Sequence, residues 1–288
     1  MKTYFFVNPS SGRHSAQRLQ FVLKRLSAHS VIPEVFQVRA PPEIFACCDK
    51  INKEQEPHLI IVAGGDGTFN AVVNGLDPGT STLAVLPFGT SNVLAAEIGI
   101  SSIEDGLKRI EAGKTAPLSV GLIELDNSSH RFVLMAGIGL DGAVVRDVWP
   151  LGKRLLRQGA YALSALKSAI AWDASVFEIS TPEGDVTCHT AIICNGSRYG
   201  GNFILSPGSS PFSSGLSAVC ITGHTRRNYL SSALDLFRNK AGTNKDLIRI
   251  QSSTFEARGK RPIQIDGDFI GYGPARISEL ADFARIIV

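Results

Sequence analysis

Short apolar runs alternate with amphipathic stretches through the first 120 residues of the chain. The apolar runs predict strands at Tyr4–Val7, Val35–Val38, Leu59–Ala63 and Leu83–Leu86. The stretches between and after them have helical spacing and predict helices at Ala16–Ala28, Pro42–Lys53, Phe69–Leu76 and Val93–Ile98. Strands that alternate with helices form right-handed βαβ units, and nearly continuous apolar strands indicate a sheet covered on both faces. The pattern therefore predicts a doubly wound, Rossmann-like parallel sheet.

The pattern changes after Pro117 to short strands joined by turns such as "DNSSH" and "TPEGD". These strands are predicted at Leu118–Leu125, His130–Met135, Ser175–Ser180, Val186–Cys194, Ser217–Thr222 and Leu247–Ser252. Two helical segments interrupt them, Leu151–Trp172 and Asn228–Asn239. The predicted fold class is α/β plus all-β. A nucleotide-binding α/β domain covers residues 1–120 and is completed by the tail at about 280–288, and an antiparallel β-sandwich covers residues 121–279.

Composition narrows the class of protein. The chain has 288 residues, of which 44% are apolar and 19% charged, as in a folded globular protein. A formal charge of +3 is too small to indicate nucleic-acid binding. Five cysteines without a CxxC or Cys/His cluster fit reduced thiols better than disulfides or zinc. With neither a secretory signal nor a long apolar run, a cytoplasmic protein is expected.

The stretch His58–Val73 reads "HLIIVAGGDGTFNAVV", a buried strand followed by three glycines around Asp66 and then a helix. Glycine permits positive φ and lets a ligand approach the backbone. A helix that begins after such a loop directs free N–H groups and the positive end of its dipole at the loop, which suits a phosphate. A tight turn with Asp66 as the helix cap explains one such loop equally well.

Two further loops have the same context, "VNPSSG" (Val7–Gly12) and "LPFGTSN" (Leu86–Asn92). The carboxyl ends of parallel strands meet at one sheet edge, where open α/β sheets bind ligands. The three loops carry hydroxyl and amide side chains: Asn8, Ser10, Ser11, Thr68, Asn70, Thr90 and Asn92. Together they favour a nucleotide phosphate site. The segment "GIGLDG" (Gly137–Gly142) also matches GxGxxG, but it lies in the β-rich half and is discounted as a dinucleotide loop.

These loops, with "NGSRYGGNFILSP" (Asn195–Pro207) and "IQIDGD" (Ile263–Asp268), resemble the diacylglycerol kinase catalytic family, which includes bacterial lipid kinases and sphingosine kinases. NAD kinases are more distantly similar and share the GGDGT motif. The resemblance implies an ATP- and Mg²⁺-dependent kinase that transfers the γ-phosphoryl group to a lipid hydroxyl, of diacylglycerol or a related lipid. The nucleotide-binding residues that it implies are Asn8, Pro9, Ser10, Ser11, Gly12, Gly64, Gly65, Asp66, Gly67, Thr68, Phe69, Asn70, Ala71 and Thr90.

The resemblance also implies an acidic proton acceptor. Asp266 matches the aspartate of the family's DGE motif, and Asp268 replaces its glutamate. Asp66 is the alternative base, since alcohols need a carboxylate to accept their proton during transfer. From the residues alone, "DGD" is also a common hairpin turn. Ser214 and Ala218 stand where the family's structural-magnesium aspartates are expected, so no structural metal site is predicted.

A kinase that acts on lipids must reach a membrane. The segment Leu151–Trp172 carries Lys153, Arg154, Arg157 and Lys167 among apolar residues, which suits an anionic bilayer surface. A helix packed on the β domain with a solvated basic edge has the same pattern. We therefore expect peripheral membrane association, with a homodimer left open. Two other functions remain: an NAD kinase-like small-molecule kinase, and a nucleotide- or lipid-binding relative without activity.

Overall fold

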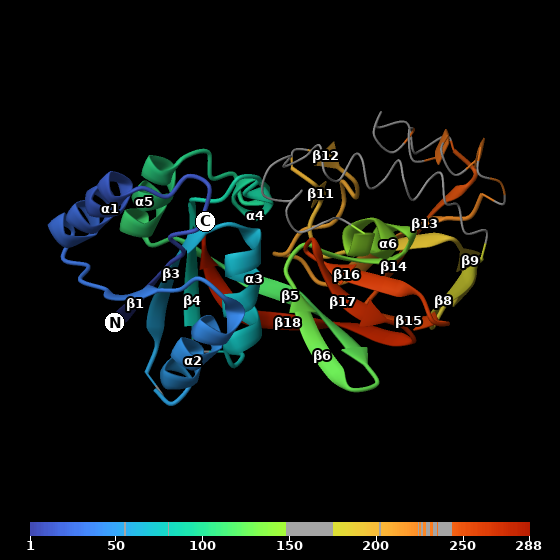
Figure 1. The fold of residues 1–288 in the computed structure, drawn as a ribbon, viewed down its shortest axis with the longest axis horizontal. Coiled ribbons are helices and arrows are strands. Elements are labelled where there is room, and N and C mark those ends of the chain that lie inside the picture. The colour runs from blue at the N-terminus through green and yellow to red at the C-terminus, as the bar shows by residue number, and fades with distance from the viewer. Residues whose placement is uncertain are drawn as a thin grey trace. The chain divides into compact units, whose positions relative to one another are not determined.

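The computed structural model describes residues 1–147, 175–223 and 244–288, apart from Gln55, Thr80 and Asn202, and a few positions between 225 and 235. The chain divides into two compact units (Figure 1). The first comprises Met1–Val120, Gly200–Asn202 and Leu280–Val288, and the second comprises Gly121–Tyr199 and Phe203–Glu279. The predicted helical segment 151–172 lies wholly outside the described residues. The predicted segment 228–239 lies largely outside them.

The first unit is built on a parallel sheet. Its strands lie in the order β2 (Glu34–Gln37), β1 (Lys2–Val7), β3 (His58–Gly64) and β4 (Ser81–Pro87). The end of β18 (Ala275–Ile287) adds a parallel strand beside β4, where Arg285 and Ile286 lie opposite Thr82 and Leu83. The carboxyl-terminal tail therefore extends the sheet formed by the first 120 residues.

Helices cover both faces of this sheet. Figure 1 shows α1 (Ala16–Ala28) and α5 (Ile103–Ala112) on one face, and α2 (Pro41–Ile51) and α3 (Asp66–Gly75) on the other. On the first face, alternate strand residues such as Phe5, Val7 and Ile61 pack with Val22 and Leu107 of the helices. The short helix α4 (Val93–Glu97) follows β4. The predicted doubly wound α/β domain is confirmed.

The second unit contains antiparallel sheets. One sheet has the strand order β14 (Leu247–Ser252), β13 (Leu216–Ile221), β10 (Thr190–Cys194), β7 (Met135–Gly139), β16 (Pro262–Ile265) and β17 (Asp268–Tyr272). In the other, β15 (Thr254–Arg258) pairs with both β18 and β8 (Phe177–Thr181), and β8 pairs with β9 (Gly184–Cys188). The helix α6 (Leu140–Asp147) follows β7 directly.

Smaller strand pairs complete this description. The long strand β5 (Thr115–Leu125) pairs with β6 (Ser128–Phe132), and β11 (Arg198–Tyr199) pairs with β12 (Phe203–Ile204). A single apolar core joins the two main sheets, with Ile179 and Phe255 from one sheet and Ile193 and Ile263 from the other all buried. The predicted antiparallel β domain is thus also confirmed.

Two predicted strands are each divided in the structure. The run His130–Met135 turns at Val133 and Leu134, so that β6 ends at Phe132 and β7 begins at Met135. The run 186–194 breaks at His189, whose backbone N–H donates to the carbonyl of Ile221 (2.9 Å). Because apolar residues continue across both breaks, the hydrophobic pattern contains no signal for either one.

Candidate functional site

The three strand–loop–helix junctions of the first unit bond directly to one another. The N–H of Asn8 donates to the carbonyl of Ala63 (3.1 Å), and that of Gly89 donates to the carbonyl of Gly64 (3.0 Å). The N–H of Arg13 donates to the carbonyl of Phe88 (2.9 Å). The loops after β1, β3 and β4 therefore form one continuous surface at the carboxyl end of the parallel strands, as the sequence predicts.

The side chain of Asn8 fixes the first loop onto the start of α3. Its Nδ2 donates to Thr68 Oγ1 (3.0 Å), while its Oδ1 accepts the N–H of Ser10 (2.9 Å). Thr68 is only 7% exposed, so this hydrogen bond between the first loop and α3 is largely shielded from solvent. The polar residues picked out from the sequence thus serve first to hold the loops together.

Close packing explains the glycines of these loops. A Cβ on Gly89 would lie 2.4 Å from Gly65 Cα, and a Cβ on Gly64 would lie 2.6 Å from Thr68 Cβ. A Cβ on Gly12 would lie 2.8 Å from Thr90 Oγ1. Gly65 has φ −95°, which other residues adopt as well. The suggestion from the sequence that Gly65 needs a positive φ is therefore wrong. Glycine is favoured here because the backbones of Gly65 and Gly89 approach each other closely.

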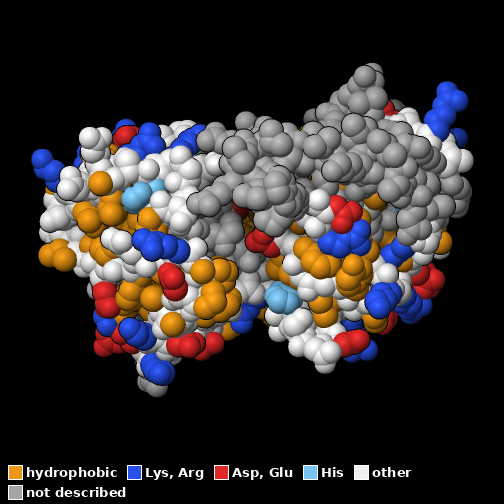
Figure 2. All heavy atoms as spheres, in the orientation of Figure 1, with side chains coloured by type: hydrophobic (Ala, Val, Ile, Leu, Met, Phe, Trp, Pro, Cys, Tyr) orange, Lys and Arg blue, Asp and Glu red, His pale blue; other side chains and the backbone are white. Residues whose placement is uncertain are grey.

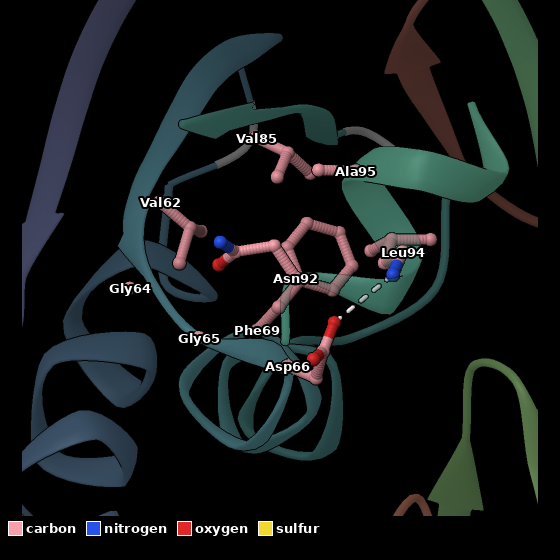
Figure 3. A pocket seen from close by; sticks show the side chains of 9 residues that line it. All are labelled: Val62, Gly64, Gly65, Asp66, Phe69, Val85, Asn92, Leu94 and Ala95. Atoms are coloured by element: carbon pink, nitrogen blue, oxygen red, sulfur yellow. Dashed lines mark hydrogen bonds between the residues drawn. The ribbon is translucent and has the colours of Figure 1, made fainter. Parts of the chain in front are cut away.

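A small pocket lies where these loops meet the helices (Figure 3). Its cavity volume is only about 10 Å³, and backbone and side-chain atoms at the start of α3 form one side. Asp66 lies there in the first turn, and its Oδ1 accepts the N–H of Leu94 (3.0 Å), which joins α3 to α4. The lining residues are Val62, Gly64, Gly65, Asp66, Phe69, Val85, Asn92, Leu94 and Ala95.

Asn92 contributes a buried acceptor to this pocket. The residue has a left-handed backbone (φ 50°) and is 9% exposed, and its Nδ2 donates to the carbonyl of Gly89 (3.0 Å). That bond leaves Oδ1 as an enclosed oxygen with no hydrogen-bond partner among the described residues. Buried polar atoms are normally paired, so Oδ1 suits a water or a ligand donor. The family resemblance does not single out Asn92 as a binding residue.

The other predicted nucleotide-binding residues differ in accessibility. Phe69 and Ala71 are buried in α3, at 2% and 7% exposed, and Phe69 lines the pocket. Ser10, Gly67 and Thr90 are exposed at the loop surface. The roles of these residues toward a nucleotide stay predictions.

Asp266 lies in a hairpin turn of the second unit. It has φ 47°, the following Gly267 has φ 91°, and the turn joins β16 to β17. The Asp266 carboxylate accepts three backbone N–H groups, from Val133 (2.7 Å), Leu134 (3.0 Å) and Met135 (2.9 Å). The hairpin-turn interpretation of "DGD" is confirmed, and the turn holds the Asp266 carboxylate in place. The role of Asp266 as a base stays a prediction.

The loop before β13, where the family is expected to hold a structural metal, carries hydroxyl groups, and Glu279 of β18 bonds to its backbone. Ser214 is exposed, and Ala218 is fully buried in β13. The N–H of Gly215 donates to Glu279 Oε2 (2.8 Å). Among the described side chains, no cluster of three or more His, Cys, Asp or Glu could hold a metal ion. The donor set around Ser214 therefore does not fit the family's structural magnesium ion.

The first part of the chain is similar to a known family of domains. Residues 2–123 match the model of the family described as "Diacylglycerol kinase catalytic domain". The predicted resemblance is confirmed. The matched segment contains all three loops and the pocket, because both lie before residue 96. Over these residues the chain is similar to the diacylglycerol kinase catalytic domain.

Relatives of the chain cover nearly its whole length. "Putative lipid kinase YtlR" of Bacillus subtilis is 24% identical over 98% of both chains. A protein named "Diacylglycerol kinase" from the same organism is 26% identical over 81% of this chain and 78% of its own. A crystal structure titled "a putative diacylglycerol kinase" from Bacillus anthracis aligns with 99% of this chain and 97% of its own, with a TM-score of 0.80 and 21% identity. The last comparison supports the fold.

The surface gives two simple observations. None of the helices that the structure describes has the length and apolar character of a bilayer-spanning helix. On the face drawn in Figure 2, the Lys and Arg side chains that are coloured lie scattered among apolar and polar ones.

Proposed function

We propose that the protein is an ATP-dependent lipid kinase that transfers the γ-phosphoryl group to the hydroxyl of diacylglycerol or a related lipid. The observation that carries the proposal is the bonding of the three loops into one surface beside the start of α3. Phosphoryl transfer depends mainly on positioning phosphates and neutralising their charge. Backbone N–H groups at a helix start do the first, and glycines let phosphate oxygens approach them.

Asp66 is the carboxylate that fits a nucleotide-borne Mg²⁺. Such an ion keeps several waters and phosphate oxygens, and it needs only one or two protein carboxylates. Asp66 lines the pocket and uses Oδ1 for the N–H of Leu94. When bound, Mg²⁺ would neutralise charge on the phosphates, while Asp66 would orient it relative to α3.

For the proton acceptor we propose an acidic residue, with Asp266 and Asp66 as the candidates and Asp268 beside them. The Asp266 carboxylate accepts three backbone N–H groups, which fix its position in the turn. A positioned base contributes roughly 10²–10⁴ in rate. Asp66→Asn should lower turnover and also weaken binding of Mg²⁺·ATP.

The acceptor is proposed to be a lipid reached at a membrane surface. Support comes from the lipid kinase names of the relatives and from the basic segment 151–172, which lies outside the described residues. The NAD kinase-like alternative shares the GGDGT loop. The inactive-relative alternative rests on Ser214 and Ala218 replacing two aspartates.

An acceptor panel tests the proposal. The full chain is incubated with γ-labelled ATP and Mg²⁺, and with vesicles that contain diacylglycerol, other hydroxyl-bearing lipids or no acceptor. NAD is offered in a parallel reaction. We expect label in the organic phase only when a lipid acceptor is present.

Three outcomes would count against it. Label on NAD alone would assign the protein to the small-molecule kinases. Binding of ATP with no transfer to any acceptor would support an inactive relative. Loss of label from ATP without an acceptor would indicate an ATPase.

A further inference from the structure

A buried hydrogen-bond chain leads to the Asp266–Gly267 turn. Asp141, in the first turn of α6, is 7% exposed and accepts the hydroxyl of Tyr199 at Oδ1 and the Nε2 of Gln264 at Oδ2 (2.7 Å). Gln264 of β16 is 2% exposed, and its Oε1 accepts the N–H of Gly267 (2.8 Å). Gln264 thus joins the Asp141 carboxylate to the turn that carries Asp266.

The glycines of "GIGLDG" make room for this chain. A Cβ on Gly137 would lie 1.7 Å from Asp141 Oδ2 and 2.7 Å from Gln264 Nε2. A Cβ on Gly142 would lie 2.2 Å from the carbonyl oxygen of Pro262. The GxGxxG spacing, which resembles a dinucleotide loop in the sequence, therefore reflects the space taken by Asp141, Gln264 and β16.

In this hydrogen-bond chain, each group can act in only one way, as a donor or as an acceptor. Because the Gln264 amide must accept from Gly267, its Nε2 has to point at Asp141, where only an acceptor fits. Burial raises the pKa of the Asp141 carboxyl, against the lowering effect of the bonds from Tyr199 and Gln264. A buried carboxylate with both oxygens occupied sets the orientation of its partners firmly.

We infer that Gln264 is a positioning residue, which orients the Asp266–Gly267 turn against the buried Asp141 carboxylate. Gln264 acts through the backbone of Gly267. The inference rests on the proposed function only for its turnover readout.

An isosteric exchange tests this inference. In Gln264→Glu a second carboxyl group faces Asp141, and two buried carboxyl groups in contact cannot both ionise, so the pair must take up a proton on folding and Tm falls most at high pH. In Asp141→Asn the amide oxygen still accepts from Gln264, while its NH₂ group turns to the Tyr199 oxygen, so the effect is small. When both changes are combined, the new amide at position 141 donates its NH₂ group to the new carboxylate at position 264 and accepts from Tyr199 at its oxygen. Gly267 donates to the other oxygen of that carboxylate, so all three bonds of the chain return.

Three measurements follow the four proteins of this cycle. We expect Gln264→Glu to lower Tm by about 5–10 °C. Exchange of the Gly267 amide should become at least about tenfold faster. With a lipid acceptor, kcat should fall while the KM for ATP stays near that of the parent. The double variant should recover Tm, Gly267 protection and kcat. Gln251→Glu, the same change at an exposed strand position, serves as the control and should alter none of them.

The results decide clearly. The inference is overturned if Gln264→Glu matches the parent, or if the double variant stays as poor as Gln264→Glu. It is also overturned if Tm follows the cycle but Gly267 exchange and kcat do not, since Gln264 would then be only a packing residue. If the parent transfers phosphate to no lipid, the proposed function fails, while Tm and Gly267 exchange still decide the role of Gln264.

Discussion

At the scale of single residues, Gly65 links the sequence motif to the proposed nucleotide site. A Cβ on Gly65 would lie 3.4 Å from Gly89 Cα, and the residue lines the pocket. Its φ of −95° suits valine, so Gly65→Val should fold. Its methyl groups would occupy the space beside the first turn of α3. We expect ATP affinity to fall at least about tenfold, or about 1.4 kcal/mol, by calorimetric titration with Mg²⁺·ATP.

Gly208→Val is the matched control, because its nearest neighbour is a flexible Gln251 side-chain atom 3.8 Å from the added Cβ. Both variants should melt near the parent. Unchanged ATP affinity in Gly65→Val would remove this loop from the nucleotide site.

A second residue-scale prediction concerns Asp266. An asparagine has one acceptor oxygen where the carboxylate has two, and its NH₂ group would face the N–H of Val133 or of Leu134 and Met135. Asp266→Asn should therefore lower the free energy of unfolding by about 1–3 kcal/mol, measured by urea denaturation. Asp268 is exposed, so Asp268→Asn should change the free energy of unfolding little. Equal stability of the two variants would contradict the clamp seen at Asp266.

Sequence reasoning finds residues more readily than their partners. The alternation of strands and glycine loops predicted that the loops carrying Asn8 and Thr68 would lie at one sheet edge, and these two side chains are hydrogen-bonded (3.0 Å). The partners of Asp266 lie about 130 residues earlier, and backbone N–H groups of any residue type can fill that role. Gln264 was missed for a related reason, because a single glutamine in a strand gives no periodic signal.

At the scale of elements, some boundaries of helices and strands are marked by local sequence signals, while others depend on tertiary contacts. Helix α5 has a serine cap at Ser102 and a left-handed Gly113 at its end, and both are local sequence signals of a helix. The break after Phe132 has no such local mark. It depends on the Asp266 carboxylate, which takes the N–H groups that would otherwise continue the strand.

The basic segment 151–172 carries an element-scale prediction that rests on sequence alone. Changing Lys153, Arg154 and Arg157 to glutamine should reduce co-sedimentation with anionic vesicles, because each basic residue near such a surface contributes about 1 kcal/mol. Binding by the parent should also weaken as salt rises. Exchanging Lys50 and Lys53 for glutamine is the control, since they lie at the end of α2 and just beyond it. Equal partitioning of both variants and the parent would assign the segment to packing.

The loop before β13 gives another element-scale prediction. Glu279 takes the N–H of Gly215, and Ser206 donates to Ser217 (3.1 Å), so hydrogen bonds hold the loop where relatives are expected to use magnesium. Tm without nucleotide should therefore be the same in EDTA as in millimolar Mg²⁺. Glu279→Ala should lower Tm, because no side-chain acceptor then remains for the N–H of Gly215. A Tm that rises with Mg²⁺ in the nucleotide-free protein would contradict this account.

At the scale of the whole molecule, the order of apolar patterns was enough to predict an α/β unit followed by a β unit. The pattern also suggested that the last residues return to the first unit, and β18 does supply Arg285 and Ile286 to its sheet. Acceptor choice is different, because an acyl-chain pocket is lined by apolar side chains that resemble core residues in the sequence. The acceptor must therefore be found by experiment.

The most direct measurement compares lipid phosphorylation by the parent and by Gly65→Val. Both proteins are given γ-labelled ATP, Mg²⁺ and vesicles in which diacylglycerol is the only hydroxyl-bearing lipid, and the label is counted in the organic phase. The account predicts label with the parent and little with Gly65→Val at subsaturating ATP. Equal label with both proteins, or none with the parent while NAD becomes labelled, would contradict a lipid kinase that binds ATP at these loops.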